Sequence, residues 1–307
     1  MLLVASTCGH QAAKSQPIES SAPSPVSSSP SSKPSSPSET PTGQPASGAA
    51  SSSTAQPLPS AAPAADPEAT YPGPTRPDWL GSRVLPTREN GAVVVPQTTP
   101  AELTDRRFAT VDTVRPPAND RFAFTDGPLE GDSLARSTWT EQCPVRVEEL
   151  RYLTVTFWGF DQRPHTGEMI VNTIVADDII SVFRALYQAR FPIEEMRIPT
   201  PADVAAPPTG DGNNTAAFVC RAVVGGTRYS EHASGLAIDI NPFHNPYKRA
   251  EVVLPELAGV YLDRADVRPG MIVEGDAVVD AFDAIGWGWG GRWSSLEDYQ
   301  HFALHDR

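Results

Sequence analysis

The folded part of the chain is organised around residues 230–239, which read Ser-Glu-His-Ala-Ser-Gly-Leu-Ala-Ile-Asp. His232 ends a predicted loop, Gly235 permits a tight turn, and residues 236–240 follow as a strand whose side chains alternate between two faces. Asp239 is therefore a carboxylate in an apolar strand, where a charge has to be paired or to bind a metal. A histidine before the turn and an aspartate after it can converge and supply two zinc ligands.

A second cluster near the C-terminus offers a third ligand. Histidine is scarce, and the six residues are His10, His165, His232, His244, His301 and His305. His301 opens a short predicted strand, and Asp298 precedes it in a predicted turn. Three protein ligands and a water are the open arrangement of catalytic zinc, and a carboxylate off the metal can act as a general base. Taken singly, these residues also have structural explanations, because such histidines are usually hydrogen-bonded and a strand aspartate can pair with an arginine.

The flanking sequence predicts the elements around these clusters. Residues 150–160 are rich in β-branched and aromatic residues, which is typical of a strand. Apolar residues recur at helical spacing from Ile174 to Tyr187, and Pro192 ends this helix. The other predicted elements are strands at 167–171, 216–223, 236–240 and 302–304, and a helix at 278–285 that Gly286 closes. The predicted fold class is α+β, a small mixed, mostly antiparallel sheet with helices packed on it.

The two clusters together resemble a known enzyme family. The pattern S-x-H-x-x-G-x-A-x-D at 230–239, followed by D-x-x-H at 298–301, is similar to the zinc D-alanyl-D-alanine carboxypeptidases. That family includes VanY- and VanX-type enzymes and phage L-alanyl-D-glutamate endolysins. The stretches Asp-Ile-Asn-Pro at 239–242, Asn-Pro-Tyr at 245–247 and Gly-Trp-Gly-Trp-Gly-Gly-Arg-Trp at 286–293 also resemble one branch. The resemblance spans roughly residues 150–305 and implies the Hedgehog/D-Ala-D-Ala peptidase-like fold.

The resemblance assigns roles to the residues of both clusters. It implies a zinc ion (Zn²⁺) held by His232, Asp239 and His301, with Asp298 as the catalytic base. Many relatives carry glutamate at the position of Asp298, and the shorter aspartate puts the reach of the base in doubt. The family also uses an arginine on a preceding strand to bind the scissile carbonyl. Arg221 matches best because it lies on a predicted strand, whereas the alternative, Arg228, is nearer the motif but sits in the glycine loop around 225–226.

The three cysteines bear on the compartment of the protein. Cys8 lies near the N-terminus, and Cys143 and Cys220 flank the first and third predicted strands of the folded domain. If the protein is exported to an oxidising compartment, a Cys143–Cys220 disulfide is the expected arrangement. The alternative is two buried free thiols.

Composition divides the chain and excludes some functions. With 24 Lys+Arg against 37 Asp+Glu, the net charge of −13 disfavours a nucleic-acid partner. No apolar run reaches the ~18 residues of an internal membrane-spanning helix. The predicted parts are a remnant of a signal or lipobox at 1–10, a disordered Ser/Pro/Ala-rich spacer at 11–75, an extended arm packed on the domain at 76–137, and a zinc peptidase domain at 138–307.

The first residues resemble a truncated export signal. Small residues precede Cys8 as in the lipobox of bacterial lipoproteins, although Thr7 stands where Gly, Ala or Ser is usual. The interpretation is a lipid anchor at Cys8 on a secreted or envelope-associated protein, and the alternative is an unstructured start with a spare cysteine.

The expected function is hydrolysis of peptide bonds in peptidoglycan stem peptides by a monomer. D-Ala-D-Ala carboxypeptidase activity is preferred, with L-Ala-D-Glu endopeptidase activity or a non-catalytic wall-binding module as the alternatives. Three tryptophans at 287, 289 and 293 either line a substrate cleft or belong to the core. His244 is a weak candidate for a fourth ligand, and His165 for a residue at the cleft border.

Overall fold

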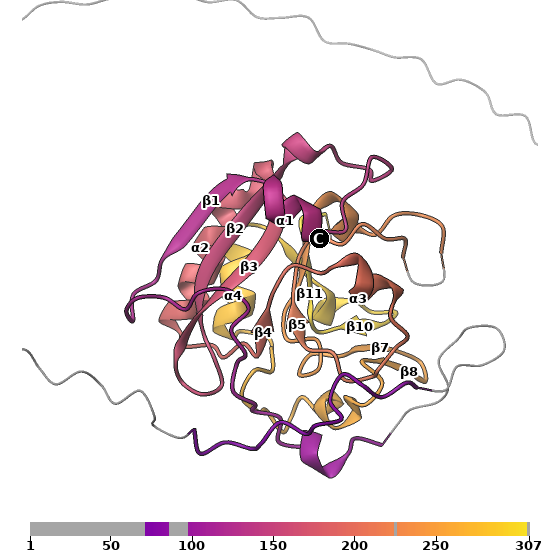
Figure 1. The fold of residues 1–307 in the computed structure, drawn as a ribbon. Coiled ribbons are helices and arrows are strands. Elements are labelled where there is room, and N and C mark those ends of the chain that lie inside the picture. The colour runs from indigo at the N-terminus through magenta and orange to yellow at the C-terminus, as the bar shows by residue number, and fades with distance from the viewer. Residues whose placement is uncertain (1–70, 86–97, 224–225, 306–307) are drawn as a thin grey trace, which may run out of the picture. The chain divides into compact units, whose positions relative to one another are not determined.

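The computed structural model describes residues 71–85, 98–223 and 226–305 (Figure 1). The predicted lipobox with Cys8, and all but the last five residues of the predicted spacer 11–75, lie outside the described residues. Among the described residues, none of the helices has both the length and the apolar character needed to span a bilayer.

The first sheet has three antiparallel strands in the order β1-β2-β3 (Figure 1). They are β1 (Phe124–Pro128), β2 (Leu150–Trp158) and β3 (Pro164–Asn172). The β-branched and aromatic sequence of β2 suits its central place, because both of its edges are hydrogen-bonded and most of its residues are buried. The strand predicted at 150–160 is confirmed, and the one predicted at 167–171 is longer at both ends.

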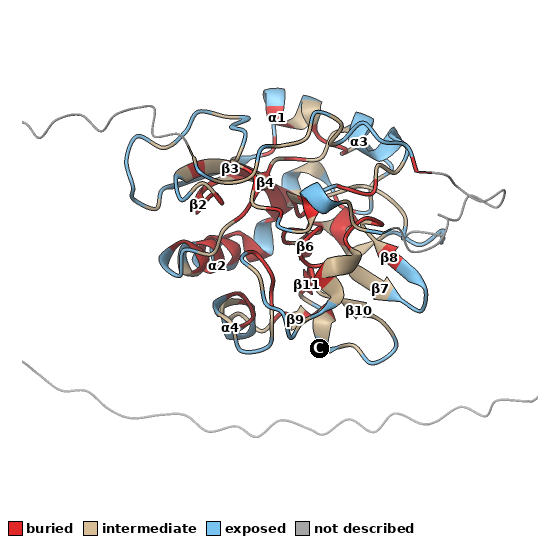
Figure 2. Cartoon of the chain, turned by 90° about the horizontal axis from the view of Figure 1, so that it is seen from below, coloured by how far each residue is buried: buried red, intermediate tan, exposed pale blue. Residues whose placement is uncertain are grey.

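One helix, α2 (Ala176–Gln188), packs on β2 of this sheet, and a second helix, α4 (Ala277–Ala284), packs against α2 (Figures 1 and 2). In α2 the apolar residues of the predicted periodicity, such as Val182 and Phe183, are buried. This helix ends before Pro192, because Arg190 takes a left-handed backbone with φ 54°. In α4 the Asp276 side chain accepts hydrogen bonds from two backbone N–H groups of the first turn.

The remaining strands form small sheets rather than one continuous sheet. One has the order β6-β11-β9, a second β10-β7-β8, and a parallel pair joins β4 to β5. The bounds are β4 (Glu195–Met196), β5 (Asn214–Thr215), β6 (Ala237–Asp239), β7 (Tyr247–Arg249), β8 (Val252–Leu254), β9 (Gly288–Trp289), β10 (Glu297–Asp298) and β11 (His301–Ala303). The α+β class is therefore confirmed. The single sheet is wrong, because short strands separated by long loops pair locally in several places.

The strand predicted at 216–223 is also wrong in its main part. Its residues make isolated bridges, from Ala216 to Asp239 and from Ala222 to Tyr229, instead of a continuous ladder. Between these bridges the Cys220 N–H donates to the Thr138 hydroxyl at 2.9 Å, and the Phe218 N–H donates to the carbonyl of Ile170 in β3 at 3.1 Å. The segment is extended, but its hydrogen bonds are divided among β3, β6 and loops, so it forms no continuous ladder with one strand.

The segment predicted as an extended arm contributes regular structure. It supplies strand β1, the helix α1 (Gly131–Arg136) and a short 3-10 turn at Ala101–Leu103. Leu103 and Phe108 are buried in a second core cluster with Phe243 and Tyr261. Short elements elsewhere are α3 (Pro201–Ala205) and the 3-10 turns Val147–Glu149, Thr173–Val175, Glu231–Ser234, Gly259–Leu262 and Gly290–Arg292.

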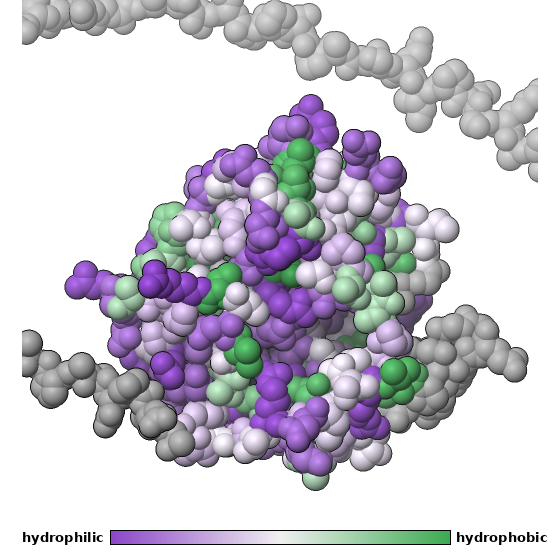
Figure 3. All heavy atoms as spheres, in the orientation of Figure 1, coloured by the Kyte–Doolittle hydropathy of each residue, from purple (hydrophilic) through white to green (hydrophobic). Residues whose placement is uncertain are grey.

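Buried residues concentrate on α2, β6 and β11, as the red segments of Figure 2 show. The outer surface is mixed: apolar residues form small separate patches among polar ones on the face drawn in Figure 3. β6 and β11 therefore lie deep in the domain, and residues on them are fixed by packing from both sides.

Candidate metal centre

Three side chains predicted as metal ligands converge on one point. His232, Asp239 and His301 each offer one ligand atom, and these atoms lie within 4.8 Å of one another. The His301 Nδ1 atom is 3.0 Å from an oxygen of Asp239 and 3.3 Å from Nε2 of His232. The latter nitrogen is also 3.3 Å from the second oxygen of Asp239.

The sheet register places two of these residues. His301 on β11 lies directly opposite Asp239 on β6, so both side chains leave the same face of the pair. His232 comes from the 3-10 turn Glu231–Ser234, which Gly235 joins to β6 with a left-handed φ of 68°. A Cβ atom on Gly235 would stand 2.7 Å from the backbone nitrogen of Asn172. The turn therefore requires glycine both for its left-handed φ and for this close contact.

A backbone carbonyl fixes the orientation of the first imidazole. The Nδ1 of His232 lies 2.6 Å from the carbonyl oxygen of Ala217, and because a carbonyl only accepts, Nδ1 carries the proton. The lone pair of Nε2 is then directed at Asp239 and His301. This is the tautomer that a metal-binding histidine needs, held by a partner outside the ligand set.

The charges of the site are strongly coupled. Burial by itself would raise the pKa of the Asp239 carboxyl, but the two imidazoles, His232 foremost, outweigh burial and hold this pKa below its usual range. Asp239 is therefore ionised at neutral pH. A carboxylate between two imidazoles can hold a metal cation.

Asp298 lies beside this cluster, and its pKa is shifted upward, opposite to that of Asp239. Burial, and then the negative charge of Asp239, raise the pKa of the Asp298 carboxyl to about 7. One of its oxygens accepts a hydrogen bond of 3.0 Å from the side-chain amide of Gln300. Gly290 packs tightly against it, because a Cβ there would stand 2.9 Å from the Cβ of Asp298. The structure places Asp298 in β10 rather than in the predicted turn.

The predicted substrate-binding arginine lies on the extended segment 216–223. The guanidinium of Arg221 donates a 3.2 Å hydrogen bond to the carbonyl of its neighbour Ala222. Its backbone N–H donates to Val219, and its carbonyl accepts from Ser230. The prediction that it lies on a regular strand is wrong, and its role toward a substrate stays a prediction.

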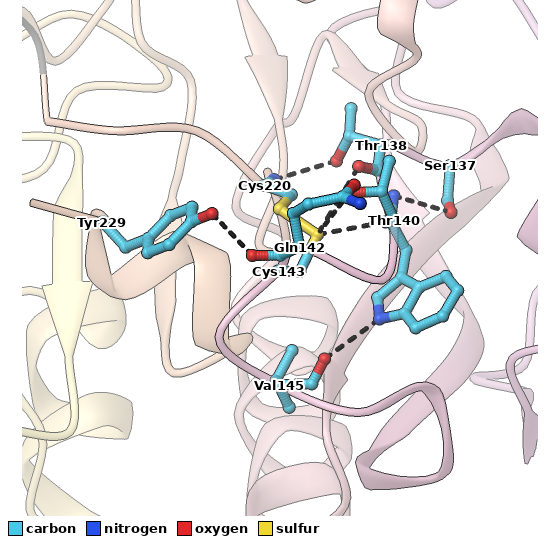
Figure 4. Close-up of a disulfide and its surroundings, with 9 residues drawn as sticks. Ser137, Thr138, Thr140, Gln142, Cys143, Val145, Cys220 and Tyr229 are labelled. Carbon is cyan, nitrogen blue, oxygen red and sulfur yellow. Dashed lines mark hydrogen bonds between the residues drawn. A yellow bond between two sulfur atoms is a disulfide. The ribbon is translucent and has the colours of Figure 1, made fainter. Parts of the chain in front are cut away.

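A disulfide anchors the same segment, as Figure 4 shows. Cys143 and Cys220 are bonded, which confirms the pairing expected from the sequence. Thr138 accepts from the Cys220 N–H, and the Tyr229 hydroxyl donates 2.6 Å to the carbonyl of Gln142 (Figure 4). The anchored segment begins with Ala216, which bridges the backbone of Asp239, and Ala217, which orients His232. The disulfide therefore braces the support of two converging residues.

The other histidines lie outside the cluster. His244 is fully buried, and its Nε2 donates 2.7 Å to the carbonyl of Arg106, so the weak expectation of a fourth ligand is wrong. His165 is buried between the carboxylates of Asp112 and Asp161, at 2.8 and 3.0 Å, rather than at the border of a cleft.

The three tryptophans divide between the two predicted roles. Trp287 and Trp289 are buried in the main core, as the structural alternative expected. Trp293 is half-buried, and its ring centroid lies 5.6 Å from that of His301. The supporting roles of Ala217 and Gly290 were not predicted from the sequence, although the glycine-rich stretch around residue 290 is typical of a close backbone approach.

Comparison with known proteins gives one finding. Residues 224–304 match the family model described as D-alanyl-D-alanine carboxypeptidase, which confirms the resemblance drawn from the two motifs. The matched segment contains the three converging residues and Asp298, whereas Arg221 lies just before it. No curated protein and no solved structure matches the chain.

Proposed function

We propose that this chain, which carries the D-alanyl-D-alanine carboxypeptidase match over residues 224–304, is a zinc-dependent peptidase acting on peptidoglycan stem peptides. The observation that carries the proposal is the convergence of His232, Asp239 and His301 with Asp298 beside them. The matched family is one of peptidases, so a hydrolase is the class of enzyme that the comparison supports.

The donor set suits zinc rather than a harder cation. Two imidazole nitrogens and one carboxylate oxygen are ligands that Zn²⁺ prefers, whereas Ca²⁺ and Mg²⁺ sites are built mainly from oxygen. The tautomer of His232, fixed by the Ala217 carbonyl, presents a lone pair where a ligand is needed. With three protein ligands the site has the composition of an open, catalytic zinc site.

Each residue of the site has a step that it can perform. A bound zinc ion would supply Lewis-acid activation of water and of the scissile carbonyl. Asp298, with a pKa near neutrality, can accept a proton at the oxygen that Gln300 does not hold and return it to the leaving amine. Arg221, if its side chain leaves Ala222, would stabilise the developing oxyanion.

Among the possible bonds we propose the terminal D-Ala-D-Ala bond. Its support is the description of the matched family. Mass spectrometry of purified muropeptides after incubation with the zinc-loaded protein tests both activity and bond. Loss of one terminal alanine supports the proposal. Cleavage between L-Ala and D-Glu would show that the protein is an endopeptidase instead. Bound zinc without any new product would favour a non-catalytic wall-binding module.

Two substitutions separate the ligand from the base. Asp298→Ala should keep bound zinc and lose about 10²- to 10⁴-fold in kcat, because general-base catalysis contributes about that much. His232→Ala should lose zinc and activity together. His305→Ala is the matched control, because it removes an exposed imidazole that takes no part in the cluster. Zinc content and turnover are measured on all three, and a fully active Asp298→Ala enzyme contradicts the proposed base.

We also propose that the protein works outside the cytoplasm, secreted or held by a lipid on Cys8. The disulfide between Cys143 and Cys220 supports export, because such bonds persist in oxidising compartments. Cell fractionation of the wild type and of Cys8→Ala tests the anchor. Release of the variant from the membrane fraction is expected, and identical distribution of the two proteins argues against lipidation.

A further inference from the structure

A hollow of about 720 Å³ opens beside the candidate metal centre, between α4 and the loop that follows β9. We infer that this hollow binds a neutral sugar ring, so that the enzyme takes stem peptides still attached to glycan. The inference rests on the proposed function for its biological meaning. The volume lies within the range of small-ligand sites in proteins, which run from about 300 to 1,000 Å³.

The wall of the hollow is shared with the metal centre. Trp293 lines the hollow, and its ring packs at 5.6 Å from the imidazole of His301. Gly290, in the same loop, stands against Asp298. A ligand in the hollow would therefore lie next to a peptide at the metal centre, as a glycan lies next to the peptide that it carries.

The charged side chains at Arg292 disfavour binding of a peptide C-terminus in the hollow. The Arg292 guanidinium donates to both oxygens of Glu274, at 2.5 and 2.9 Å, and to both oxygens of Asp283, at 2.7 and 2.8 Å. Two carboxylates thus more than neutralise the one cation, and the trio carries a net negative charge. A ligand carboxylate would be repelled there, so the hollow does not suit a C-terminal carboxylate.

The lining has the features that an uncharged sugar needs. Trp293 is half-buried and offers an aromatic surface for the C–H face of a pyranose ring. Ser294 and Ser295 are exposed at the edge and carry hydroxyls for the ring substituents. Trp287, which is 2% exposed, stiffens the wall behind them. An aromatic surface for apolar contact, together with polar groups that fix the orientation of the ligand, is a combination found in small-molecule sites.

Direct binding tests the hollow without relying on catalysis. An N-acetylglucosamine tetramer is titrated into the full chain and followed by saturation-transfer NMR, with protein zinc content recorded. We expect binding to the wild type, binding weakened about three- to ten-fold in Trp293→Leu, and unchanged binding in Trp139→Leu. The last is a matched control, because Trp139 is equally half-buried but contacts Val145 near the disulfide.

A second variant keeps the test valid if Trp293→Leu disturbs folding or His301. Ser295→Glu adds bulk and charge at an exposed rim position and should also weaken tetramer binding. Absence of binding to the wild type, or equal binding in both rim variants and the control, overturns the inference.

Kinetics then separate this inference from the proposed function. The ratio of kcat/KM for a glycan-linked stem peptide to that for the free peptide should exceed one in the wild type and fall about three- to ten-fold in Ser295→Glu. Tetramer binding without hydrolysis of either peptide would sink the peptidase but keep the sugar site. Equal hydrolysis of both peptides without tetramer binding would support the peptidase and overturn the sugar site.

Discussion

The buried pair between Arg106 and Glu194 gives the sharpest prediction about stability. The guanidinium donates to both oxygens of Glu194, at 2.7 and 2.8 Å, and to the carbonyl of Asp211 at 2.6 Å. Arg106 is 2% exposed and Glu194 is 0% exposed. Arg106→Met leaves a buried carboxylate with Asn213 and the part-exposed Arg76 as its remaining partners.

Removing one partner of a buried ion pair costs about 3–5 kcal/mol. For a domain of this size, that loss lowers Tm by about 6–20 °C. The neighbouring Arg107→Met is the matched control, because Arg107 also holds an aspartate, Asp105, but both side chains are exposed. The control should cost about 0–1 kcal/mol.

Urea unfolding at pH 7 measures both variants against the wild type. Burial opposes the charge of Glu194, but Arg106 outweighs burial and holds the pKa of Glu194 below its usual 4.5. The stabilisation from this carboxylate is therefore present above about pH 4.5 and is lost as the pH falls through the depressed folded pKa. Equal free energies of unfolding for the two arginine variants would show that the buried Arg106–Glu194 pair contributes no more to stability than an exposed one.

Three further results are expected. Reduction of the Cys143–Cys220 disulfide should lower the free energy of unfolding, measured by calorimetry, by about 2–5 kcal/mol. It should also weaken zinc binding, measured by competition with a chelator. An unchanged zinc affinity would contradict the proposal that the disulfide braces the candidate metal centre. Burial would lower the pKa of His165, but its two aspartate partners outweigh burial and raise this pKa above 6.5. The stabilisation from the charged imidazole is therefore complete below about pH 6.5 and is lost as the pH rises through the raised pKa. The free energy of unfolding of His165→Asn, measured across this pH range, should lack that change. Gly290→Ala should lower kcat, because the added methyl group would press on Asp298. A fall in Tm without a fall in kcat would contradict this prediction.

Local patterns predicted the elements that local interactions define. The helix at 174–187 and the strand at 150–160 follow from side-chain periodicity and β-branched composition, and both appear within a few residues of the expected bounds. The two clusters of candidate ligands were recognisable because each candidate residue lies in a short motif. Their convergence, by contrast, depends on the pairing of β6 with β11, which no local pattern encodes.

Long-range pairing explains the misses. Strand β1 reads Phe-Thr-Asp-Gly-Pro, a poor strand sequence, and it forms because β2 has a free edge for it. The segment 216–223 is apolar like a strand, but its hydrogen bonds are divided among β3, β6, His232 and loops instead of forming a ladder with one strand. The Arg106–Glu194 pair joins residues far apart in the chain, so neither sequence neighbourhood announces it.

The register between β6 and β11 has a consequence for how such a site tolerates change. Asp239 and His301 face each other across a ladder, so their spacing is set by backbone hydrogen bonds and not by the intervening residues. An exposed turn between them, such as residues 250–251 between β7 and β8, could therefore change in length without altering how these two side chains face each other. A designer seeking a new specificity could graft a loop at that turn and leave Asp239 and His301 in place.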